Sequence, residues 1–146
     1  MKDRTQTITT TGALLLVVFG VATAKDVAVT LSGDQEVPAR ETDAHGKADV
    51  SYNKCTKQLD FTVSWHNLTG IPTGAHIHGI APRGMNAGVK VDYFALIPKT
   101  ISGTFSYSVL VDEIAIKEDS LLAGYYYFNF HTPKFPGGEI RGQIEF

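Results

Sequence analysis

Cysteine is almost absent from this sequence of 146 residues, because Cys55 stands alone. A single thiol excludes an intramolecular disulfide, so the fold has to be stabilised by a hydrophobic core. Cys55 has no histidine near it in the sequence and lies between two strand patterns. We therefore interpret it as a neutral, partly exposed thiol at a hairpin tip rather than as a metal ligand.

Long apolar runs are also missing. The longest one, residues 12–21, is about half of the roughly 20 residues that a membrane-spanning helix needs. It follows Lys2 and Arg4 and leads into an Ala-x-Ala motif at residues 22–24, which is the pattern of a cleaved secretory signal. We expect a signal peptide at residues 1–24, one mature domain at residues 25–146, no membrane span after cleavage, and a secreted, periplasmic or extracellular location. A retained anchor is the alternative.

Several classes of function lack the residues that they need. The 13 Lys and Arg residues are outnumbered by 15 Asp and Glu, the net charge is −2, and no basic stripe is present, which disfavours nucleic acid as a partner. The sequence contains no Gly-x-Ser-x-Gly elbow, no His-Glu-x-x-His motif and no glycine-rich phosphate loop. Serine hydrolase, zincin and nucleotide chemistry are therefore disfavoured.

Period-two alternation of apolar and polar residues recurs along the chain and predicts half-buried strands. It occurs at residues 27–31, 59–65, 104–109 and 139–144, with clusters of Gly, Pro, Asn and Asp between the runs. Residues 117–123 predict a short connecting helix that Gly124 ends. We expect an all-β fold, an antiparallel Greek-key β-sandwich or barrel with one short helix.

Three histidines are candidates for a metal site. His76 and His78 alternate with apolar Ala75 and Ile77, so both imidazoles should leave the same polar face of a strand. His131 has the matching parity in a second strand-like run, residues 128–132. If the two strands are neighbours, the three imidazoles can reach one ion at about 2.0–2.1 Å. An all-nitrogen ligand set favours copper, and less strongly zinc.

Other polar residues are expected around this site. Asn129 shares the face of His131, and Glu139 or Arg141 in the last strand can orient an imidazole or attract an anion if that strand is adjacent. The alternative for Glu139 and Arg141 is a charge pair on a solvated surface. Residues 81–88, rich in turn-forming residues, are the expected rim of the site, or simply a long hairpin connection.

His45 and His66 are the two remaining histidines. His45 lies in a predicted turn, and His66 follows Trp65 at the end of a strand. Each is either a fourth ligand or an ordinary surface histidine.

The sequence resembles the CHRD domain family, which was first described in chordin. The resemblance rests on four motifs in the family's order: LSGDQEVP at 31–38, AHIHG at 75–79, YFNFHT at 127–132 and GGEIRGQ at 137–143. It implies an all-β extracellular domain, which in bacteria commonly stands alone behind a signal peptide and in chordin belongs to a protein that binds growth factors. Binding of an extracellular protein is therefore one role that the resemblance implies.

A weaker likeness is to the copper and zinc superoxide dismutases, in which His76, His78 and Arg141 would correspond to residues of the copper site. The zinc loop and the disulfide of those enzymes are missing. From the residues and the resemblance together, we expect an exported β-domain that binds a transition metal through His76, His78 and His131, with no catalytic residues assigned. A structural or protein-binding domain without metal is the alternative, and an enzyme acting on superoxide is the third option.

Overall fold

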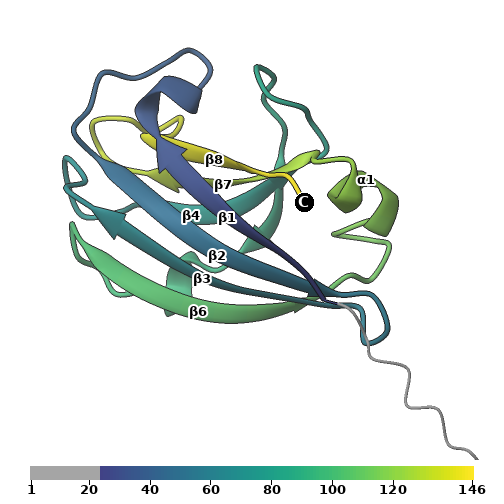
Figure 1. The fold of residues 1–146 in the computed structure, drawn as a ribbon. Helices are drawn as coiled ribbons and strands as arrows, with labels where there is room; N and C mark the ends of the chain where they lie inside the picture. The colour runs from purple at the N-terminus through teal and green to yellow at the C-terminus, as the bar shows by residue number, and fades with distance from the viewer. Residues whose placement is uncertain (1–23) are drawn as a thin grey trace, which may run out of the picture.

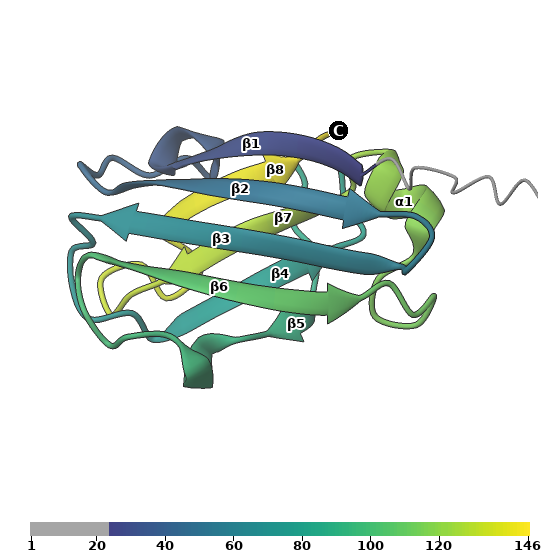
Figure 2. The same cartoon turned by 60° about the horizontal axis from the view of Figure 1, so that its bottom comes forward.

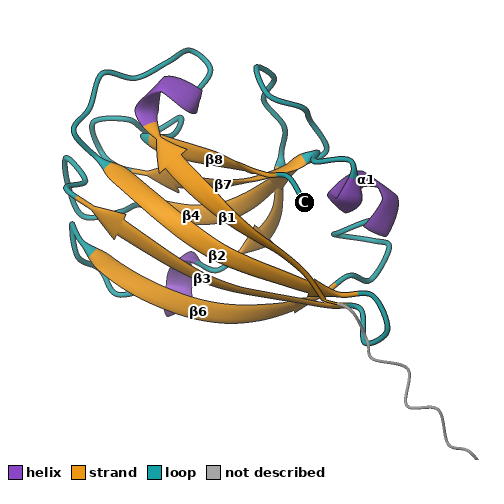
Figure 3. Ribbon diagram, viewed as in Figure 1, coloured by secondary structure: helices purple, strands orange, loops and turns teal. Residues whose placement is uncertain are grey.

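The computed structural model describes residues 24–146, and the expected signal peptide lies almost wholly outside the described residues. Strands dominate the fold (Figures 1 and 3). The elements are β1 (Ala24–Ser32), η1 (Gly33–Gln35), β2 (His45–Asn53), β3 (Gln58–His66), β4 (Gly74–Gly79), β5 (Val89–Asp92), η2 (Phe94–Leu96), β6 (Gly103–Leu110), α1 (Glu118–Leu122), β7 (Tyr126–His131) and β8 (Ile140–Ile144).

The strands form one curled antiparallel sheet in the order β5-β4-β7-β8-β1-β2-β3-β6. One layer contains β1, β2, β3 and β6, and the other contains β5, β4, β7 and β8 (Figure 2). The layers are joined where β8 meets β1, through the single pair Arg141 and Ser32. This arrangement confirms the predicted all-β antiparallel fold.

The core lies between the two layers, where the apolar members of each alternating run meet. The ring centroids of Phe61 and Phe128 are 5.0 Å apart, and those of Trp65 and Phe130 are also 5.0 Å apart. These contacts join β3 in one layer to β7 in the other. Burial of such large aromatic surfaces is the main source of stability in a chain with no disulfide.

The short elements also follow the sequence signals. Residues 118–122 form the predicted helix, and Gly124 follows it with a φ of +78°, the left-handed conformation that glycine adopts most readily. Cys55 lies exposed in the turn between β2 and β3, as expected. In the part of the chain that the structure describes, no helix has the length and apolar character to cross a membrane.

Glu139, just before β8, connects three loops at one end of the sandwich. Its carboxylate is fully buried and accepts hydrogen bonds from the hydroxyls of Thr42 (2.7 Å), Thr69 (2.9 Å) and Thr132 (2.7 Å). The backbone N–H of Thr69 donates a further bond at 3.1 Å. The buried charge is stabilised because every donor around it points at an oxygen.

We predict that Glu139→Gln destabilises the protein by about 1–3 kcal/mol, because an amide NH2 would then face hydroxyl and backbone donors. Urea unfolding followed by tryptophan fluorescence measures the loss. Glu41→Gln, at an exposed position, is the matched control and should change stability by less than about 0.5 kcal/mol. Equal effects of the two substitutions would contradict the anchoring role of Glu139.

Candidate metal centre

The register between β4 and β7 brings the three histidines together. His131 lies opposite Gly74, and His76 lies opposite Asn129. Ala75 and Ile77 enter the core with no exposed surface, so His76 and His78 project from the outer face of the layer. We call His76, His78 and His131 the histidine cluster.

The ring nitrogens of the cluster are close enough to share one ion. His76 Nδ1 lies 3.1 Å from His131 Nε2, which lies 3.4 Å from His78 Nε2. All three ligand atoms lie within 4.8 Å of one another. Ligands at 2.0–2.1 Å from a tetrahedral ion are about 3.3 Å apart, so these separations are suited to a transition metal.

Backbone carbonyls orient two of the rings. Nδ1 of His78 lies 2.9 Å from the carbonyl oxygen of Ala87, and Nδ1 of His131 lies 3.0 Å from that of Pro136. A carbonyl oxygen only accepts hydrogen bonds, so each Nδ1 carries the proton in these contacts. In the neutral rings the two Nε2 atoms therefore present lone pairs to each other across 3.4 Å.

His76 has a carboxylate partner on its other nitrogen. Its Nε2 lies 3.7 Å from Oδ1 of Asp92 on the neighbouring strand β5. A carboxylate in this position favours a proton on Nε2 and leaves Nδ1 free to face His131. All three rings are thus held with one nitrogen toward a common centre.

Burial keeps the imidazoles neutral. It lowers the pKa of His78 to about 4, and the charges of His131, His76 and Arg141 act in the same direction, against the hydrogen bond to Ala87. Burial also lowers the pKa of His76, against the attraction of Asp92. The pKa of His131 is lowered chiefly by burial as well. Neutral imidazole is the form that binds metals, so the cluster has its ligand form near pH 7.

Gly74 makes room for the cluster, a role that no sequence pattern indicated. A Cβ atom at Gly74 would lie 2.8 Å from Cε1 of His76 and 2.9 Å from Cδ2 of His131. Both distances are shorter than van der Waals contact. Any larger residue at this position must therefore move the two rings.

Arg141 lies behind the cluster and is separated from it by Tyr127. Its guanidinium carbon is 3.6 Å from the centroid of the Tyr127 ring, and this ring also stacks on His78 with the centroids 5.1 Å apart. The guanidinium donates to the carbonyl oxygens of Met85 (2.9 Å) and Pro82 (3.2 Å). Arg141 therefore holds residues 82–87 against the site, and Tyr127 supports this loop by donating to and accepting from Ala87.

The alternative of a solvated charge pair between Glu139 and Arg141 is wrong. Both side chains are at most 1% exposed, and they bind different loops. The reason is that loops cover the polar face of this layer, which strand alternation alone cannot show. Arg141 is also not placed to attract an anion from solvent, because its Nη atoms are already bonded to loop carbonyls and to Gln143.

Asn129 contacts a buried acid rather than a histidine. Its side-chain amide donates to Glu36 Oε1 and to the carbonyl oxygen of Ile140. Burial raises the pKa of Glu36 to about 7, although Asn129, Arg141 and Arg40 act to lower it. Glu36 lies within the LSGDQEVP motif, yet its contact with Asn129 across 93 positions of sequence has no local signal.

His45 and His66 do not join the cluster. They lie opposite each other on β2 and β3, in the other layer. In the described residues, the group of potential ligands that converges consists of His76, His78 and His131.

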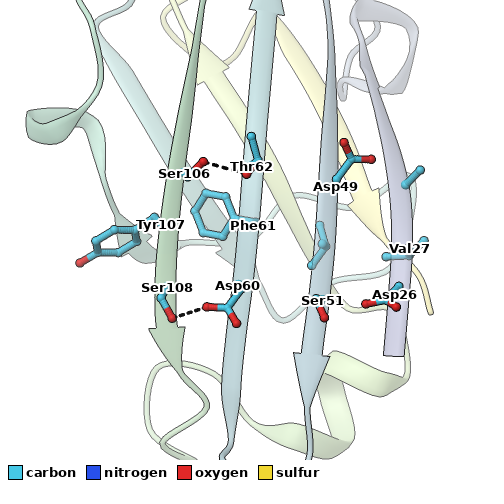
Figure 4. Close-up of a pocket in the computed structure, with 12 residues that line it drawn as sticks. Asp26, Val27, Asp49, Ser51, Asp60, Phe61, Thr62, Ser106, Tyr107 and Ser108 are labelled. Carbon is cyan, nitrogen blue, oxygen red and sulfur yellow. Dashed lines mark hydrogen bonds between the residues drawn. The ribbon is translucent and has the colours of Figure 1, made fainter. Parts of the chain in front are cut away.

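The hollow shown in Figure 4 lies on another part of the surface. It extends over the outer face of β1, β2, β3 and β6, and its floor carries short polar side chains such as Asp49, Asp60 and Thr62. Thr62 and Ser106 share a hydrogen bond there, and Ser108 donates to Asp60. None of the five histidines lines this hollow. The converging nitrogens make the cluster the stronger candidate site.

Comparison with protein families confirms the resemblance that the four sequence motifs indicated. The model of the CHRD domain matches residues 27–144, a span that contains all three residues of the cluster. Comparisons with curated proteins and with solved structures found no match.

We predict that the metal-free protein loses stability through His78 as the pH falls from 7 to 5. The unfolded chain takes up a proton below a pH of about 6.5, whereas folded His78 stays neutral until about 4, so acid favours unfolding. Urea unfolding in EDTA at pH 7 and at pH 5 should show that the parent loses about 2 kcal/mol more stability than His78→Gln over this interval.

Glu36 supplies the internal control, because its contribution has the opposite sign. Its raised pKa stabilises the folded state below about pH 4.5, and that contribution disappears as the pH rises through 7. The Glu36→Gln variant should therefore lose more stability than the parent between pH 7 and pH 5. Identical pH dependence in the parent and in His78→Gln would refute the assignment to His78.

Proposed function

The chain belongs to the CHRD domain family, and we propose that it is an exported β-domain that binds one transition-metal ion through His76, His78 and His131. One observation carries the proposal. The Nε2 atoms of His78 and His131 lie 3.4 Å apart while both Nδ1 atoms donate to backbone carbonyls. Two lone pairs facing each other repel, and a cation between them turns that repulsion into attraction.

Copper is the preferred ion. Three imidazoles without a thiolate suit copper or zinc, and copper(II) binds such sites more tightly than zinc by the Irving–Williams order. The carbonyls of Ala87 and Pro136 and the carboxylate of Asp92 are the outer partners that fix the rings. We propose no superoxide chemistry, since Arg141 is buried and engaged by loop carbonyls.

The competing function is that of a structural or protein-binding domain that holds no metal. The 3.1 Å separation between His76 Nδ1 and His131 Nε2 also suits a direct hydrogen bond between the rings. In that case the histidines hold β4 and β7 in register, and the surface serves structural contacts or a protein partner. Metal titration distinguishes these two functions.

We predict that Cu(II) binds the mature protein with one tight equivalent in isothermal titration calorimetry, and that Zn(II) binds more weakly. His76→Ala or His131→Ala should weaken the tight equivalent at least about 100-fold, because two imidazoles hold an ion much less well than three. The titrations use a Cys55→Ser background, since the exposed thiol can itself bind or reduce copper.

His45→Ala is the matched control, because this histidine lies outside the cluster. It should leave the tight equivalent intact. If His76→Ala and His131→Ala both keep tight binding, the cluster is not the site. If the parent binds no Cu(II) tightly, and the same substitutions lower the melting temperature in EDTA, the histidines serve a structural or protein-binding domain that holds no metal.

Gly74→Ala tests the geometry without removing a ligand. The new Cβ would push the rings of His76 and His131 apart, so we predict a 10–100-fold loss of Cu(II) affinity with all three histidines present. Gly88→Ala is the control, because a Cβ there meets nothing within 4 Å. Unchanged affinity in Gly74→Ala would show that the rings adapt and that the close packing is not needed.

A further inference from the structure

The second pair of histidines has a geometry of its own. His45 on β2 and His66 on β3 are direct partners in the antiparallel register. Their ring centroids are 5.4 Å apart, with the ring planes inclined by 28°. Both side chains are exposed on the outer face of the layer formed by β1, β2, β3 and β6.

The protonation pattern of His45 leaves a ligand atom free. Its Nδ1 lies 3.0 Å from the backbone carbonyl oxygen of Asp43, so Nδ1 carries the proton and Nε2 keeps the lone pair. Directly opposed residues in an antiparallel pair have Cβ atoms about 4.5–5.5 Å apart. The two rings are stacked as the structure has them, so each ring has to turn about its Cβ–Cγ bond before one nitrogen of each can lie about 2.0 Å from a single ion.

The surroundings of the pair are acidic. A surface hollow is lined by Glu41, Asp43 and Asn67 together with Thr42, Thr69 and Lys134. Asp43 and Asn67 are close sequence neighbours of His45 and His66. The two carboxylates favour the approach of a cation, Lys134 in the hollow opposes it in part, and Lys47 on the strand of His45 is paired with Asp49.

We propose that His45 and His66 form a second copper(II) site, weaker than the cluster and open to solvent. The two imidazoles occupy neighbouring coordination positions on the ion, and water molecules occupy the remaining ones. This geometry suits copper(II), which prefers a tetragonal set of nitrogen and oxygen ligands. Affinity is lower than at the cluster, because two donors replace three and exposed rings must be ordered when the ion binds.

The experiment removes the cluster and asks what remains. The protein carries His76→Ala, His78→Ala and His131→Ala in the Cys55→Ser background, and Cu(II) is titrated by calorimetry with electron paramagnetic resonance of the bound ion. We expect one weak equivalent with nitrogen hyperfine structure. Adding His45→Ala or His66→Ala should weaken it about tenfold or more, because the chelate is lost. Lys47→Gln, an outward residue on the same strand, should not.

If the triple variant does not fold, the parent provides the same test. His66→Ala should then abolish the second, weaker equivalent and leave the first unchanged. A weak equivalent that survives both His45→Ala and His66→Ala overturns this proposal and leaves the cluster unaffected. The absence of a tight equivalent in the parent overturns the proposed function of the cluster and leaves the second site testable.

Discussion

The antiparallel register between β4 and β7 is the constraint on which both the core and the candidate site depend. It places Ile77 opposite Phe128 on the inner face and His76 opposite Asn129 on the outer face. A slip of one residue in either strand would turn its imidazoles into the core and its apolar side chains outward. The burial of Phe128 and Phe130 against Phe61 and Trp65 opposes such a slip, so hydrophobic packing on one face fixes the geometry of the histidine cluster on the other.

Behind the cluster lies a layer of buried polar groups, which is unusual for the outer face of a sandwich. Arg141, Gln143 and Asn129 each have at most 3% of their surface exposed, because the loops on either side fold over this face. Each of these groups bonds to a loop carbonyl or to another buried side chain. Buried polar groups of this kind are tolerated only when their partners are in place. Because moving any of these groups would break hydrogen bonds in a buried environment, they form a rigid scaffold around Tyr127 and His78.

Strand alternation was sufficient to predict the fold class and the shared face of the three histidines, and Gly124 marked the end of the predicted short helix. Those features follow from local period and parity, which short segments contain. The roles of Gly74 and Glu36 could not be predicted. Gly74 matters because the rings of His76 and His131, from different strands, leave no room for a Cβ there. Glu36 matters because it accepts a hydrogen bond from Asn129, which is 93 positions away in the sequence. Arg141 was misjudged for the same reason, since its burial depends on loops that are remote in sequence.

The two histidine groups illustrate how the same side chain acquires different properties on the two layers. In the cluster, backbone carbonyls hold the rings of His78 and His131 by hydrogen bonds, and burial confines the ring of His76 near Asp92, so little conformational entropy would be left to lose if an ion bound. At His45 and His66 the register supplies proximity, but both rings are exposed to solvent. If both proposals hold, the same donor atoms should therefore differ in affinity through preorganisation rather than through chemistry. The buried positive charge of Arg141 acts against a positive charge in the cluster, so a metal ion bound there would have to overcome this repulsion as well as the loss of its water.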